Sequence, residues 1–320
     1  LASPTQVANY LFKELGIKPV LFTPTGKPKT DDEALSYIEH PIAIDTIEYR
    51  QLQHTDSTYV TGFLEKLDIN NYLHCTFRQM GARTGRTSCV KPNLQQLPKR
   101  GRLGEWVKTA FIGNITTFDY WQMEAVLYSY MNNDTRMIKA VEAGKDLYKF
   151  LSQILYAKTN INKDERELGK TLFLGRIYGM GDEKFKKKSH GLDPEGSREF
   201  FDKLKKMQNK VKDDVKNKGF VETIFERRRH LTFRDAYKGL NAIIQGSAAD
   251  IIKTAMINLP LSIQNKMMTQ VHDELVFREL KDSERKIVSE VMCDFPPFKL
   301  KVDYGKGSNW WRAFCDKENK

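Results

Sequence analysis

Two pairs of carboxylates lie where apolar, strand-like segments meet polar residues. Asp119 comes near the end of NITTFDYW and is followed by Glu124, while Asp273 and Glu274 lie at the polar centre of KMMTQVHDELVFREL. Burying a carboxylate is costly unless a cation compensates its charge. Aspartates from two strands would form an oxygen site suited to Mg²⁺, and two ions about 4 Å apart could support phosphoryl transfer. The alternative is that each aspartate only caps a helix or closes a turn.

A basic stripe offers the partner for phosphate. Arg166, Lys170, Leu174 and Tyr178 recur every four residues, so they share one face of the helix predicted over 163–178. A guanidinium, an ammonium and a phenol ring on one face suit a triphosphate with a base stacked beyond it. The alternative is a surface stripe that holds only an i,i+4 pair.

The segment GARTGRTSCVKPNLQQLP is basic and reads as a loop. Arg83 and Arg86 could contact phosphates, whereas Asn93 and Gln95 offer paired donors and acceptors. Amide side chains of this kind can bind sugars and groove edges, where the acceptors of different base pairs are arranged alike. The alternative is a long surface loop with a proline-defined turn.

The elements that must position these residues follow from the periodicity and the capping residues. Their order, helices and then a strand, a long helical insertion and strands again, predicts an α+β fold with an inserted helical subdomain. The helices are predicted over 3–15, 31–67 with a break near His40, 122–131, 163–178, 196–218 and 241–256. A strand is predicted over 114–121 and a hairpin over 266–280.

The charge supports a polyanionic partner. The chain has 320 residues and a formal net charge of +11. The excess lies in residues 78–110, with eight basic residues against one acidic, and in 158–238, with 22 against 14. Nucleic acid is the expected partner, because each phosphate that is neutralised releases counterions. For the lysine-rich stretch 184–188 the alternative is a solvated helix face.

Several classes are excluded by composition. The four cysteines form no CxxC pair and no zinc-ligand spacing, so we expect a reducing intracellular compartment and no disulfide framework. No run of 18 apolar residues exists, so we expect no membrane-spanning helix and no membrane partner. The first residue is Leu, which suggests a fragment or a processed product.

Together these segments resemble the polymerase domain of family A DNA polymerases almost from end to end. In chain order the matching motifs are LFKELGIKP, IEYRQL, STYVTGFL, TGRTS, PNLQQLP, FDYWQME, RELGKTLFLGRIYGMG, NAIIQGSAADIIKTAM, QVHDELVF and GKGSNW. The resemblance implies a right-hand fold with an antiparallel palm sheet, helical fingers and a partial thumb. The thumb would be 1–68, the palm 69–127 and 239–320, and the fingers 128–238.

The resemblance also implies roles for single residues. Asp119 and Asp273 are similar to the two metal-binding aspartates, with the Tyr120 carbonyl as a further ligand. Glu274 resembles a less direct catalytic carboxylate and Lys170 the proton donor to pyrophosphate. Nucleotide binding is implied for Arg166, Lys170, Leu174, Tyr178, Gln122 and Glu124, the last crowding the sugar 2′ position. DNA binding is implied for Arg83, Arg86, Asn93, Gln95, Asn241, Gln245 and His272.

Some positions depart from the family pattern. Leu174 stands where Phe or Tyr is usual, Tyr148 where a phosphate-contacting His is common, and Tyr237 where an Arg is common. These differences suggest a phage, viral or otherwise divergent member. Sugar selectivity and fidelity therefore cannot be carried over from the family at Leu174.

The activity implied is template-directed addition of dNTPs to a primer 3′ end, with two Mg²⁺ ions for which Mn²⁺ can substitute. The partners would be primer-template DNA and dNTPs, and the chain would be a monomer in the cytoplasm of a bacterial host or beside its nucleoid. No second acidic cluster remains to supply proofreading, so we expect an upstream exonuclease or other domain outside this chain. The alternatives are a single-subunit RNA polymerase and a non-catalytic fragment that binds primer-template DNA.

Overall fold

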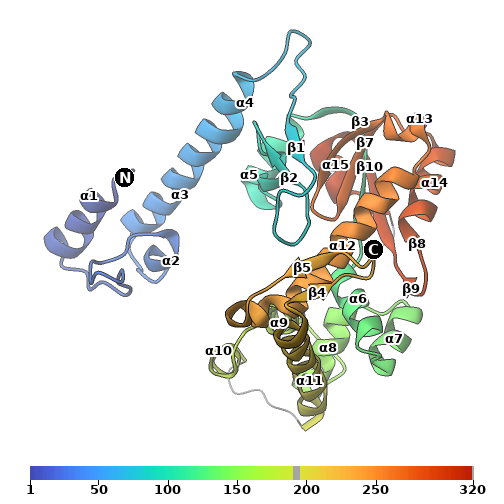
Figure 1. Cartoon of the computed structure of the whole chain (residues 1–320). Coiled ribbons are helices and arrows are strands. Elements are labelled where there is room, and N and C mark those ends of the chain that lie inside the picture. Colours follow the sequence, from blue (N-terminus) through green and yellow to red (C-terminus); the bar gives the residue numbers. More distant parts are fainter. Residues whose placement is uncertain (190–194, 319–320) are drawn as a thin grey trace. The chain divides into compact units, whose positions relative to one another are not determined.

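The computed structural model describes residues 1–189 and 195–318 (Figure 1). The chain divides into two compact units, and each is described by itself. The first unit comprises residues 1–76 and 91–108, and the second comprises 77–90 and 109–320. The thumb, palm and fingers boundaries expected from the sequence stay predictions, and their ranges include 190–194 and 319–320, which lie outside the described residues.

The first unit is built mainly from helices around a small apolar core of Val7, Leu11, Leu35, Ile38 and Ala43. The predicted break near His40 is confirmed, because its side chain accepts the Ile42 N–H at 3.2 Å and a proline opens the helix that follows. The elements are α1 (Pro4–Ala8), η1 (Asn9–Glu14), α2 (Asp32–Leu35), α3 (Pro41–Thr55), η2 (Asp56–Thr61), α4 (Gly62–Leu64), η3 (Leu94–Gln96) and α5 (Gly101–Thr109).

The second unit contains a five-stranded antiparallel sheet in the order β11-β10-β3-β7-β6. Its central strand is buried from Ile115 to Phe118, as expected for a strand with neighbours on both sides. Phe118 meets Phe277 edge to face at 5.8 Å, which joins the two middle strands. The strands are β3 (Ile112–Tyr120), β6 (Met267–Val271), β7 (Glu274–Arg278), β10 (Val302–Asn309) and β11 (Lys317–Glu318).

The described residues also form three two-stranded ribbons and a further set of helices. The ribbons pair β1 (Thr76–Arg78) with β2 (Ser88–Val90), β4 (Phe220–Glu222) with β5 (Arg228–His230), and β8 (Asp294–Phe295) with β9 (Phe298–Lys299). The helices are α6 (Met123–Met131), α7 (Thr135–Glu142), α8 (Leu147–Tyr156), α9 (Lys163–Ile177), α10 (Asp182–Lys188), α11 (Glu195–Lys218), η4 (Phe233–Lys238), α12 (Gly239–Asn258), α13 (Leu261–Gln264), α14 (Asp282–Cys293) and α15 (Trp310–Cys315).

Two features fix the helix that carries the basic stripe. Asn162 and Glu165 form a reciprocal capping box at the start of α9, which satisfies backbone N–H groups there. Phe173 is buried on the inner side of α9 and meets Tyr128 of α6 edge to face at 5.2 Å. In Figure 1, α8, α9 and α11 gather at the end of this unit away from the sheet. The predicted α+β class and the predicted elements are thereby confirmed.

Two expectations from composition can be compared with the structure. In the described residues, Cys75, Cys89, Cys293 and Cys315 form no disulfide bond with one another. Within the described ranges, the helices are all too short or too polar to cross a membrane.

Candidate active site

The two aspartates predicted as metal ligands lie on neighbouring backbone segments. Asp119 pairs across the sheet with Glu274, the first residue of β7. One residue further along each strand, the N–H of Tyr120 donates to the carbonyl of Asp273 at 3.3 Å. The end of β3 is thereby joined to the tip of the β6–β7 hairpin, which supports the pairing of Asp119 with Asp273 that the sequence suggested.

The hairpin tip is held in shape by the side chain of Gln270, which was not among the residues predicted from the sequence. His272 has a φ of 55°, which allows the tight reversal between β6 and β7. Gln270 donates from its amide nitrogen to the His272 carbonyl and accepts a hydrogen bond from the Thr87 hydroxyl. Gln270 therefore ties the hairpin tip to the segment that carries Arg86.

Arg86 is brought directly to the carboxylates. Its Nη2 donates to Oε1 of Glu124 at 3.1 Å and to Oδ1 of Asp273 at 3.3 Å. The side chains of Arg86, Glu124 and Asp273 keep 25%, 11% and 27% of their surface exposed, so the three charges are largely removed from water. In such surroundings a guanidinium offsets part of the cost of two nearby negative charges.

Glu124 is a protonation-sensitive group in this network. Burial raises the pKa of the Glu124 carboxyl, and the Tyr178 hydroxyl and Arg86 guanidinium oppose that rise without cancelling it. Tyr178 donates its hydroxyl proton to the Glu124 carboxylate. Burial and then the Glu124 charge raise the pKa of Tyr178 well above its ordinary value, so this phenol stays protonated and able to donate.

Glu274 has a different setting from the aspartates. It is 4% exposed, and the indole N–H of Trp310 donates to its Oε1 at 3.1 Å. Asp119 also pairs with Asp303 of β10 on its other side, so three acidic residues form one row across the sheet. The sequence reading missed Asp303 and Trp310, because strand register is what brings them to this row.

The basic stripe on α9 lies as predicted, with neighbours that the sequence did not reveal. Nε of Arg166 donates to Oδ2 of Asp146 at 2.7 Å, and its Nη1 donates to Oε1 of Glu167 at 2.9 Å. Nζ of Lys170 lies 4.0 Å from Oε2 of Glu167. Leu174 is partly buried and packs against the main core. The two cations are thus held by carboxylates that a phosphate could replace.

Gln122 joins the end of the central strand to α8. It has a φ of 48°, a left-handed conformation at the residue that precedes α6. Its Oε1 accepts the Leu147 N–H at 2.8 Å, so its side chain satisfies a backbone donor at the start of α8. This contact places the predicted nucleotide-binding Gln122 next to the helix that faces the cations of α9.

The remaining residues predicted to bind DNA are distributed over both units. Gln245 of α12 hydrogen-bonds Tyr178, and the buried Oδ1 of Asn241 has no hydrogen-bond partner in the described part of the chain. Arg83 lies near Arg229. Asn93 and Gln95 belong to the first unit, where the Asn93 side chain accepts the Gln95 N–H at 3.0 Å.

A buried ion pair supports the segment that carries Arg86. Nε of Arg227 donates to Oδ1 of Asp250 at 2.8 Å, and its Nη2 donates to the carbonyls of Thr84 and Gly246 at 2.9 and 3.1 Å. The Thr223 hydroxyl donates to the other oxygen of Asp250 at 2.6 Å. The sequence reading missed this clamp, because its members lie far apart in the chain.

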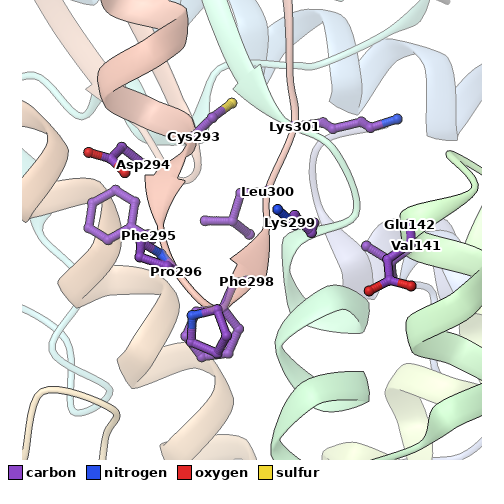
Figure 2. Close-up of a pocket in the computed structure, with 11 residues that line it drawn as sticks. Val141, Glu142, Cys293, Asp294, Phe295, Pro296, Phe298, Lys299, Leu300 and Lys301 are labelled. Carbon is purple, nitrogen blue, oxygen red and sulfur yellow. The ribbon is translucent and has the colours of Figure 1, made fainter.

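A cavity of about 480 Å³ is lined by a different set of residues (Figure 2). It is bounded by the β8–β9 hairpin and the end of α7, and its wall combines aromatic and proline side chains with two lysines. Its lining residues are Val141, Glu142, Cys293, Asp294, Phe295, Pro296, Pro297, Phe298, Lys299, Leu300 and Lys301. It contains none of the residues predicted from the sequence.

The donor set predicted for a metal ion consists of oxygen atoms, which suits a hard divalent cation. It comprises the carboxylates of Asp119 and Asp273 and the backbone carbonyl of Tyr120, and the backbone contact between Tyr120 and Asp273 joins the two segments that carry them. Across residues 1–189 and 195–318, no three His, Cys, Asp or Glu side chains gather closely enough to hold a metal ion. A divalent ion here would therefore also need oxygens from the backbone, water or substrate, as Mg²⁺ usually does.

Comparison with known proteins shows the family of this chain. The family model for DNA polymerase family A matches residues 1–312. DNA polymerase I of Synechocystis sp. is 31% identical over 98% of this chain and 37% of its own length, and the thermostable DNA polymerase I of Thermus aquaticus is 29% identical over 98% of the chain and 42% of its own length. This chain therefore spans about two fifths of these relatives.

A solved structure is similar over nearly the whole chain. It is the POL domain of Pol1 from M. smegmatis, in complex with DNA primer-template and dNTP. The match has a TM-score of 0.87 and 29% sequence identity, and it covers 98% of this chain and 61% of that one. The fold, the order of the motifs and the extent of the family match lead to one conclusion: this chain belongs to DNA polymerase family A.

Proposed function

We propose that this chain carries out template-directed DNA synthesis, adding dNTPs to a primer 3′ end with release of pyrophosphate. The observation that carries the proposal is the contact between Tyr120 and Asp273, because it brings the end of β3, with Asp119, to the hairpin tip. The M. smegmatis domain, with primer-template and dNTP bound, supports the same substrates for this chain. The proposed division is a partial thumb in 1–68, palm in 69–127 and 239–320, and fingers in 128–238.

Family A polymerases use divalent metal ions, and we assign that site here to Asp119, Asp273 and the Tyr120 carbonyl. Two Mg²⁺ ions, or Mn²⁺ in their place, would activate the primer hydroxyl and neutralise charge on the triphosphate. Glu274, bound by the Trp310 indole, would support this site from the neighbouring strand position.

The protein's own residues would position the nucleotide and its phosphates. Arg166 and Lys170 would exchange their carboxylate partners for the triphosphate, and Lys170 would donate a proton to the leaving pyrophosphate. Glu124 would occupy the space beside the sugar 2′ carbon, held there by Tyr178 and Arg86. Positioning of this kind supplies most of the catalysis in phosphoryl transfer.

Gln122 and Leu174 would complete the nucleotide site, and the DNA-binding residues would follow the duplex. We assign that second task to Arg83, Arg86, Asn93, Gln95, Asn241, Gln245 and His272. Cysteines that form no disulfide bond suit a reducing compartment, and the proposed working form is a monomer.

A primer-extension assay on a set of primer-template duplexes tests the function. Each template would present one of the four bases, and each reaction would contain one dNTP, a dideoxynucleotide or an rNTP. We expect extension by the complementary dNTP and a strong preference over the rNTP. Extension that ignores the template base would contradict the proposal, as would preferred use of rNTPs, which would indicate an RNA polymerase. Salt-sensitive DNA binding without incorporation would indicate a non-catalytic fragment.

A further inference from the structure

We propose that Tyr148 is a positioning residue, whose aromatic face holds the two phosphate-binding cations of α9 in register before a nucleotide arrives. The inference rests on the proposed function, because it concerns the same nucleotide site. Tyr148 does not contact the reacting atoms in this account. It acts through Arg166 and Lys170.

Both cations lie over one ring. Cζ of Arg166 and Nζ of Lys170 are each 5.5 Å from the centre of the Tyr148 ring. A cation within about 6 Å of an aromatic face is attracted by the negative charge of that face. Since Arg166 and Lys170 are one helical turn apart on α9, a single ring on α8 can serve both.

The ring is itself fixed. Tyr148 is 6% exposed, and its ring lies 6.3 Å from that of Phe173 in the main core. The next turn of α8 is fastened to α9, because the Ser152 hydroxyl lies 2.8 Å from the Tyr148 carbonyl and 3.0 Å from the Glu165 carbonyl. Because a rigid ring already orders the two long side chains, they lose less conformational entropy when a ligand binds.

The ring and the neighbouring carboxylates hold the cations in different ways. Asp146 accepts a hydrogen bond from Nε of Arg166 and Glu167 accepts one from Nη1, and these are groups that a phosphate could also use. An aromatic face contacts the flat side of a guanidinium and accepts none of its in-plane hydrogen bonds. A triphosphate can therefore displace the carboxylates while the ring keeps its contact.

The hydroxyl of Tyr148 adds no competing charge. Burial raises the pKa of Tyr148 far above its ordinary value, and the charge of Glu124 raises it further. The phenol is therefore neutral at neutral pH. The ring face, and not the hydroxyl, is the part of Tyr148 over which the two cations lie.

Substitution of Tyr148 by phenylalanine, and then by phenylalanines carrying one, two and five ring fluorines, tests this account. Fluorine withdraws charge from the ring face and leaves the packing nearly unchanged. The readouts are the dNTP dissociation constant and maximal rate from single-turnover incorporation, together with calorimetric binding of inorganic tripolyphosphate. We expect Tyr148→Phe to stay within about three-fold of the parent, and the pentafluoro variant to bind both ligands about ten-fold more weakly.

Tyr148→Leu removes the ring altogether and should weaken dNTP binding at least as much as the pentafluoro variant. Its melting temperature and its affinity for primer-template DNA serve as controls for folding. Equal triphosphate binding by all the fluorinated variants would overturn the inference, as would a loss in Tyr148→Phe as large as in Tyr148→Leu. Failure of the parent to incorporate any dNTP would overturn the proposed function, whereas tripolyphosphate binding would still report on the ring.

Discussion

Nη2 of Arg86 lies 3.3 Å from Oδ1 of Asp273, so a guanidinium already neutralises the carboxylate that we propose as a metal ligand. The same nitrogen also contacts Glu124. A residue proposed to follow the DNA minor groove thus holds an active-site carboxylate when no DNA is bound. A metal ion would compete with Arg86 for the Asp273 carboxylate, and DNA would compete with Asp273 for the Arg86 guanidinium.

Arg86→Met should therefore tighten metal binding to the DNA-free protein while it weakens primer extension. Removing one nearby positive charge from a partly buried carboxylate is worth about 1 kcal/mol, or roughly five-fold in affinity. Mn²⁺ binding followed by electron paramagnetic resonance would measure the change. Arg228→Met is the matched control, since Arg228 pairs with Glu222 at an exposed position. Weaker Mn²⁺ binding in Arg86→Met than in the control would contradict the account.

Glu124 should titrate above the usual glutamate pKa of about 4.3. Burial is the main cause, and the hydrogen bond from Tyr178 partly offsets it, so Tyr178→Phe should raise the pKa further. Because the folded-state pKa is raised, the stability that Glu124 contributes is complete below the unfolded-state pKa and is lost as pH rises through the folded-state value. Side-chain carboxyl NMR of the two proteins, with Glu124→Gln to assign the signal, would measure the shift. A lower pKa in Tyr178→Phe would refute this reading.

Glu124→Ala should relax discrimination against ribonucleotides. The carboxylate is held by Tyr178 and Arg86 in the space assigned to the sugar 2′ position, and a methyl group would leave that space open. We expect the preference for dNTP over rNTP to fall by at least about ten-fold, since relief of a steric clash of 1–3 kcal/mol is typical. Single-turnover rates with matched dNTP and rNTP would measure it. An unchanged ratio would remove Glu124 from sugar selection.

Arg227→Met should destabilise the second unit and loosen the segment that carries Arg86. The variant leaves Asp250 without its charge partner and removes two hydrogen bonds to backbone carbonyls, at a cost of about 3 kcal/mol. Urea unfolding would give the loss, and amide exchange in residues 82–87 should rise. Arg227→Met with Asp250→Leu should recover part of the stability. Equal exchange in that segment for parent and variant would show that the clamp does not hold it.

The sequence predicted the elements and much of the candidate site, because local patterns determine them. The capping residues at Asn162 and the four-residue spacing from Arg166 onward place α9 and its stripe correctly. Alternation around the His272 turn places the hairpin that carries Asp273. These features depend on neighbours within a few residues, which sequence patterns report directly.

The contacts between distant segments could not be predicted in the same way. Asp146 beside Arg166, and Trp310 beside Glu274, arise from helix packing and strand register over 20 and 36 residues of sequence separation. The Tyr148 ring was noted only as a departure from the family pattern. Its contact with Arg166 and Lys170 depends on the packing of α8 against α9, which the sequence pattern does not report. The phage or viral source suggested by such departures stays a prediction.

The metal-binding role of Asp119 and Asp273 is the central claim, and single-turnover incorporation of one complementary dNTP tests it most directly. Asp119→Asn and Asp273→Asn keep the size of each side chain and remove its charge. Asp213→Asn, an exposed change on α11, is the matched control. We predict that each active-site variant loses at least about a thousand-fold in rate while it still binds primer-template DNA. A rate for either variant within ten-fold of the control would contradict the account.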